Sequence, residues 1–143
     1  MVSVRRKLVF DADIEPLFDY LVAPPNIAQY VGPVRRIRGF SDGEIGEGTE
    51  VTVEASFLGI HFHQHTRCTV FARPHTFACE SVGGRFHFVA GFTLSPARRG
   101  TLLEGWGDAE APGLFHFAEP ILGRLIGHQV SRDLEELRRR FRR

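Results

Sequence analysis

The chain has 143 residues, 43% of them hydrophobic, which suits one domain over residues 1–143 with a single core. Its formal net charge of +1 supplies no field for a polyanion, so we expect no nucleic-acid partner. No apolar run reaches the roughly 18 residues of a membrane span, and Met1 to Lys7 lacks a signal-peptide core. Two cysteines form no disulfide framework, so we expect a cytoplasmic protein with free thiols.

The first forty residues predict a strand, two short helices and a second strand. Val4 to Phe10 forms the first strand, and Asp13 is the expected N-cap of a helix with a short apolar face. Residues 26–30 follow two prolines as a second short helix, and residues 34–40 form the next strand. The glycine-rich connection that follows lacks the Gly-Lys-Ser/Thr ending of a phosphate loop.

Strands are next expected over residues 48–57, 60–72, 77–82, 85–95 and 101–110, each joined to the next by a hairpin. The short turn after residue 57 pairs Ala55 with Phe62 and Val53 with Gln64. Later loops pair Val70 with Cys79, Cys79 with Phe88, Phe77 with Ala90 and Phe92 with Gly105. Because the apolar face passes from strand to strand without a break, the pattern predicts one antiparallel sheet with one buried face. The expected inward residues are Val51, Val53, Phe57, Phe62, Gln64, Thr66, Val70, Phe77, Ser81, Phe86, Phe88, Phe92 and Leu103.

Residues 113–143 contain the one long run of helical periodicity. Such a helix needs a concave apolar surface to lie in, and the strands must supply that surface. Pro120 and Gly123 loosen its first half, so we expect a cavity between that half and the sheet. The arginines at its end suit a solvated helix terminus better than a nucleic-acid or membrane tail.

The order of these elements resembles the START-like superfamily, also called helix-grip or SRPBCC. The segment from Phe10 to Leu21 is similar to the family's strand-to-helix opening, and Gly46-Glu47-Gly48-Thr49 to one of its strand starts. Pro112-Gly113-Leu114-Phe115 and Glu119-Pro120-Ile121-Leu122 resemble its polyketide cyclase/dehydrase branch. The resemblance implies an α+β helix-grip fold, with a seven-stranded antiparallel sheet wrapped around a long C-terminal helix and two short helices after the first strand. Members of this superfamily hold hydrophobic small molecules; some cyclise or dehydrate aromatic polyketides and some carry lipids.

The expected function is therefore binding or transport of a hydrophobic molecule, aromatic polyketide-like or lipid-like. The alternative is a polyketide aromatase/cyclase or dehydrase that acts in the same cavity. No carboxylate or histidine falls on the inward face, which favours binding, and His116 is the nearest candidate for acid-base work. Gln64 either orients a ligand or bonds Tyr30 or a trapped water. The expected ligand-binding residues are Tyr30, Phe57, Phe62, Gln64, Phe88, Phe92, Phe115, Ala118 and Leu122.

A row of histidines at 61, 63 and 65 has the two-residue spacing of His-x-His metal sites. The register puts these side chains on the solvent face, where Glu54 pairs with His63, so we expect neither a metal site nor a cofactor. Cys68 and Cys79 are expected inside the core, offset by one pair. Trp106 falls on the outer face, as a homodimer contact or as an ordinary exposed side chain.

Overall fold

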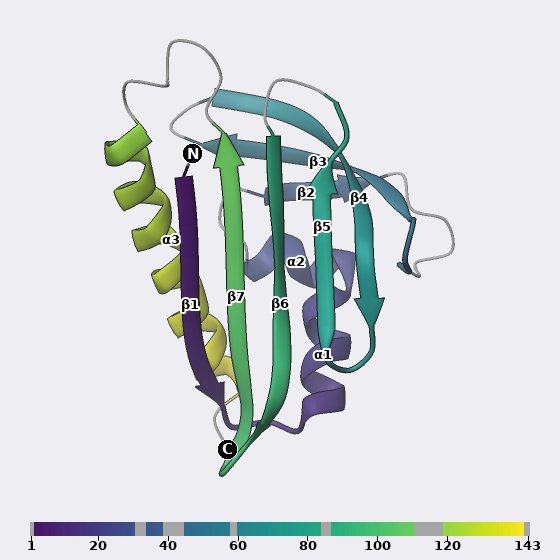
Figure 1. Cartoon of the computed structure of the whole chain (residues 1–143), viewed down its shortest axis with the longest axis vertical. Coiled ribbons are helices and arrows are strands. Elements are labelled where there is room, and N and C mark those ends of the chain that lie inside the picture. Colours follow the sequence, from purple (N-terminus) through teal and green to yellow (C-terminus); the bar gives the residue numbers. More distant parts are fainter. Residues whose placement is uncertain are drawn as a thin grey trace.

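The computed structural model describes residues 2–30, 34–38, 45–57, 60–83, 87–110 and 119–141. Within these ranges the chain forms one seven-stranded antiparallel sheet and three helices, an α+β helix-grip fold (Figure 1). Sheet order is β1-β7-β6-β5-β4-β3-β2, so β1 and β2 are the edges. The elements are β1 Val2–Phe10, α1 Ile14–Val22, α2 Pro24–Tyr30, β2 Val34–Arg38, β3 Glu50–Phe57, β4 Ile60–Ala72, β5 Thr76–Ser81, β6 His87–Ala97, β7 Gly100–Glu110 and α3 Glu119–Arg140.

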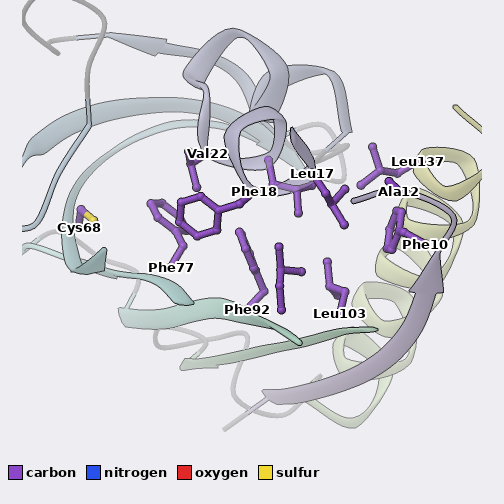
Figure 2. Close-up of a cluster of buried hydrophobic side chains, with 12 residues drawn as sticks. Phe10, Ala12, Leu17, Phe18, Val22, Cys68, Phe77, Phe92, Leu103 and Leu137 are labelled. Carbon is purple, nitrogen blue, oxygen red and sulfur yellow. The ribbon is translucent and has the colours of Figure 1, made fainter. Parts of the chain in front are cut away.

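The three helices lie on one side of the curved sheet, and α3 runs along its β1 edge (Figures 1 and 2). The helix α3 contacts β1 and α2, while α1 covers the middle strands. Asp13 is the N-cap residue of α1, as the sequence predicts, with an extended backbone and its carbonyl accepting from the Leu17 amide. No helix among the described residues has both the length and the hydropathy of a membrane span.

Two of the predicted hairpin registers are confirmed. The β3–β4 pairing includes Ala55 with Phe62 and Val53 with Gln64, and the β6–β7 pairing includes Phe92 with Gly105. Residues 48 and 49, predicted as strand, instead belong to a turn in which the Thr49 amide donates to the Gly46 carbonyl.

The predicted register between β4 and β5 is wrong by one residue at the loop, where Ala72 pairs with Thr76, and by two residues beyond a β-bulge between Cys68 and Val70. An extra residue in one strand reverses which side chains point inward beyond it. Val70, predicted inward, is therefore 38% exposed, and Phe71 packs against the core instead. The β5–β6 register is also wrong by two residues, with Phe77 opposite Phe92. A shift of two keeps the face, so these rings still point inward.

The packed core lies beneath α1 and the last turns of α3 (Figure 2). Phe18 of α1 stands edge-on to Phe71 and Phe92, with ring centroids 5.4 and 5.9 Å away. Leu137 of α3 is 1% exposed and belongs to the same cluster, which Phe10 extends to the β1 edge. Edge-to-face ring contacts and burial stabilise this cluster.

Gly91 is required by close packing at the centre of the sheet. A Cβ at this position would clash with the Phe77 carbonyl oxygen and lie 2.9 Å from the Ala78 Cβ. At Gly107, on the neighbouring strand β7, an added Cβ would meet its nearest atom, the Ala90 Cβ, at 3.9 Å. One glycine thus avoids a collision with backbone, whereas the other leaves space unfilled.

We predict opposite effects of alanine at these two glycines. Gly91→Ala should lower the free energy of unfolding by about 1–3 kcal/mol, because the new methyl group displaces the backbone of β5. Gly107→Ala should leave that free energy unchanged or raise it slightly, because strands disfavour glycine. Urea unfolding of both variants measures this, and equal destabilisation would contradict the assignment.

Candidate functional site

A cavity of about 310 Å³ opens between α3 and the strands β1, β6 and β7. The helix wall is formed by Ile126, Val130, Leu134 and Leu137, which recur at three- and four-residue steps on one face. The sheet wall is formed by the first halves of β1 and β6 and by β7, and the cavity adjoins the packed core, with which it shares Leu21, Phe92, Leu103 and Leu137. The site is therefore one end of the concave face, walled by α3.

Small residues make this end of the sheet hollow. Ala90, Gly105, Gly107 and Ala109 all face the cavity from β6 and β7. Side chains on the concave side of a strand recur every second residue, so a glycine there removes a whole side chain from the interior. The next inward positions, Leu94 of β6 and Leu103 of β7, are large and pair with each other in the packed region.

Three aromatic side chains line the inner part of the cavity. Phe88 and Phe92 come from β6, and Tyr30 comes from the last residue of α2. The Tyr30 hydroxyl donates to the Leu21 carbonyl of α1, so it is already satisfied by the protein. Burial raises the pKa of Tyr30 above its usual value, which keeps the phenol neutral. The tyrosine presents a fixed ring to the cavity and no acid-base group for neutral pH.

Arg6 is a charged cavity residue that the apolar pattern of the sequence does not predict. It lies on β1 opposite Gly105, and its side chain lines the cavity and extends toward α3. Its Nε donates to the Ser131 hydroxyl at 2.8 Å and its Nη2 to the Gly127 carbonyl at 3.2 Å. Side chains two residues apart on a strand share a face, so inward Phe10 and Leu8 predict that Arg6 also points inward. Charged residues are rare at inward positions, so the apolar pattern alone did not mark it.

The fold and its cavity match a known family over almost the entire chain. The model of the family described as polyketide cyclase / dehydrase and lipid transport matches residues 1–142. The chain belongs to this family. A comparison with curated proteins finds no match.

Solved structures with the same fold come from several bacteria. A protein from Thermus thermophilus superposes with a TM-score of 0.80 at 17% identity, covering 97% of this chain and 96% of that one. A START superfamily protein from Mycobacterium smegmatis gives 0.74 at 14% identity, covering 99% and 100%. A conserved protein from Geobacillus kaustophilus gives 0.74 at 15% identity, covering 98% and 95%. At these identities the likeness establishes the START-like fold alone.

In this member of the cyclase/dehydrase and lipid-transport family, the structure brings three of the predicted ligand-binding residues together. Tyr30, Phe88 and Phe92 line the cavity, whereas Phe62 and Gln64 are not among its lining residues. Gln64 is buried, and its amide nitrogen donates to the carbonyls of His65 and Gly83 rather than to Tyr30. Phe115, Ala118 and the side chains of Phe57 and Leu122 lie outside the described residues, as does His116.

The described helix wall of the cavity runs from Ile126 to Leu137. The loosened first half of the helix, where the sequence predicts the cavity, lies in part outside the described residues. Ile121 and Leu125 are 64% and 44% exposed, so they face away from the cavity. Among the described residues, the cavity lies where the sheet is hollow, at Gly105 and Gly107.

The histidine row lies on the exposed face of β4, as predicted. Glu54, the predicted partner of His63, accepts from Arg36 at 2.9 Å and pairs with Arg38 at 2.9 Å, while His63 lies 3.8 Å away. The hydrogen bond from Arg36 is the main reason that the pKa of Glu54 falls below its usual value. Among the described residues, no group of three or more His, Cys, Asp or Glu side chains is arranged to hold a metal ion.

The two cysteines face each other directly across β4 and β5 instead of being offset by one pair. The shorter loop after Ala72 and the bulge after Cys68 together bring Cys68 into line with Cys79. Burial, and to a smaller extent the facing Cys68, raises the pKa of Cys79 to about 12, and burial also raises the pKa of Cys68. Thiols with raised pKa values are poor nucleophiles at neutral pH, so this pair suits a packing role.

We predict that Cys79 reacts slowly in the folded protein. At about pH 8 a thiol with a pKa near 12 carries on the order of a thousandfold less thiolate than a free cysteine. The variant Cys68→Ala leaves Cys79 as the single thiol, and its reaction with Ellman's reagent can be followed before and after unfolding in guanidinium. A folded-state rate within tenfold of the unfolded rate would contradict the predicted environment.

Proposed function

We propose that this protein binds a hydrophobic small molecule in the cavity between α3 and the sheet. The observation that carries the proposal is the pair of inward glycines, Gly105 and Gly107, at the hollow end of β7. An added Cβ at either position would find no heavy atom nearer than 3.5 Å. Larger side chains there would fill the space and stabilise the fold, so the chain keeps a hollow that packing alone does not require.

The chemistry of the walls supports an apolar occupant. The side chains that face the cavity from β6 and α3 are aromatic or aliphatic, and each buried Å² of apolar ligand surface contributes about 25 cal/mol. Aromatic rings at Phe88, Phe92 and Tyr30 suit a planar or aromatic guest as well as an alkyl chain. Cytoplasmic binding or transport of a polyketide-like or lipid-like molecule is the function that we assign.

The alternative is a polyketide cyclase or dehydrase in the same cavity. Such an enzyme needs an acid or base within hydrogen-bond reach of the substrate. Of the described side chains on the concave side of the cavity, the ionisable ones are Arg6 and Tyr30. Tyr30 has its hydroxyl bonded to a carbonyl, and an arginine stays protonated. This pair favours a binding role over proton transfer.

We predict that the neutral fluorophore N-phenyl-1-naphthylamine binds in this cavity and that Gly107→Leu blocks it. The leucine occupies the hollow, so the probe's Kd should rise at least about tenfold, a loss of roughly 1.4 kcal/mol. The free energy of unfolding should stay the same or increase, because the new side chain buries apolar surface. Fluorescence titration and urea unfolding measure the two quantities.

A matched control adds bulk on the opposite face of the sheet. Val9 of β1 is 45% exposed, and Val9→Phe should leave the Kd of the probe unchanged. If the wild-type protein takes up no probe, or if Gly107→Leu binds it as tightly as wild type, the binding function is wrong.

A further inference from the structure

Arg6 presents a charge to a cavity whose other concave-side walls are apolar. Its neighbours on β1 and β7 are Val4, Leu8 and Gly105, and its side chain is half-buried against α3. No described carboxylate forms an ion pair with it, whereas Arg5, the next residue, pairs with Asp108 at 3.1 Å on the other face. Charged side chains are rare at inward positions of a sheet, so a half-buried arginine without a described carboxylate partner is an unusual feature of this wall.

The protein uses only part of the hydrogen-bonding capacity of this guanidinium. An arginine has five N–H donors. Three have protein acceptors: the Ser131 hydroxyl for Nε, the Arg5 carbonyl for Nη1 at 2.7 Å and the Gly127 carbonyl for Nη2. One donor on each Nη nitrogen has no acceptor among the described residues. Two remaining donors are the number that a bidentate carboxylate or sulfonate accepts.

The helix α3 is adapted to hold the guanidinium in place. Gly127 is buried in the helix, and a Cβ there would lie 2.9 Å from Nη2 of Arg6. Glycine costs a helix about 1 kcal/mol relative to alanine, yet it gives this side chain its room. Ser131, one turn later, fixes Nε. The three residues form a seat that orients a positive charge at the cavity wall.

We propose that the ligand is an apolar molecule with one acidic group, a carboxylate or a comparable oxyanion, and that Arg6 pairs with that group. This inference rests on the proposed binding function and adds the chemical class of the ligand. The apolar body occupies the hollow above Gly105 and Gly107, and the acid lies against the free donors of Arg6. A charge-assisted, bidentate pair gives orientation as well as affinity.

The test compares two fluorophores with one skeleton. N-phenyl-1-naphthylamine is neutral, and 8-anilinonaphthalene-1-sulfonate adds a sulfonate to the same rings. In Arg6→Gln the Kd of the sulfonate probe should rise at least about tenfold, whereas the Kd of the neutral probe stays within about threefold. Arg5→Gln removes a charge from the same strand but the opposite face, and it should change neither Kd by more than about threefold.

A second measurement needs no variant at Arg6. Decanoate should displace the neutral probe from the wild-type protein at least about tenfold more effectively than methyl decanoate, which has the same chain without the charge. Gly127→Ala keeps the arginine but crowds it, and it should reduce this preference for the acid.

The outcomes separate the two proposals. If the neutral probe binds but Arg6→Gln weakens both probes equally, Arg6 is a structural tie between β1 and α3, and the acidic-ligand proposal is overturned. Equal displacement by acid and ester, or equal effects of Arg5→Gln and Arg6→Gln on the sulfonate probe, would also overturn it. If neither probe binds the wild-type protein, the binding function itself fails.

Discussion

The structure depends on how three helices share one concave sheet face. A sheet with one apolar face must have that face covered, and α1 does so tightly, with Phe18 inserted between Phe71 and Phe92. The long helix α3 lies along the β1 edge and reaches the packed core mainly near its end, at Leu137. The same face is therefore packed at one end and hollow at the other.

The hollow follows from side-chain size rather than from a gap in the backbone. The sheet is continuous through β1, β7 and β6 at the cavity, and its hydrogen-bonded registers run the full length of these strands. Where Leu94 and Leu103 face each other, the interior is full; where Ala90 and Gly107 face each other, it is open. Such a cavity is preformed, so a ligand need not displace secondary structure to enter it.

Charge is distributed unequally between the two sides of the sheet. The exposed side carries the ion pairs Arg5–Asp108, Lys7–Glu104 and Arg67–Glu50, which are solvated and contribute little each. On the concave side, Arg6 is seated by neutral acceptors from Gly127 and Ser131. The charge that faces the cavity thus comes from the first strand.

Local pattern in the sequence determined the elements and most of the sheet. Alternation with a period of two identified the strands, and turn residues set the β3–β4 and β6–β7 registers, including Phe92 opposite Gly105. The same alternation placed His61, His63 and His65 on the exposed face. These features depend on neighbours in the chain or across one hairpin, which is why a sequence can predict them.

Only the tertiary structure decided where the cavity lies and that Arg6 faces it. The bulge after Cys68 depends on how β4 bends over the core. It places Phe71 on the inner face, where the sequence predicts Val70. The cavity wall from Ile126 to Leu137 depends on how α3 meets the β1 edge. Arg6 bonds to Gly127 and Ser131, which follow it in the chain by 121 and 125 positions. Contacts of that separation leave no periodic trace in a sequence, because they are set by the packing of complete elements.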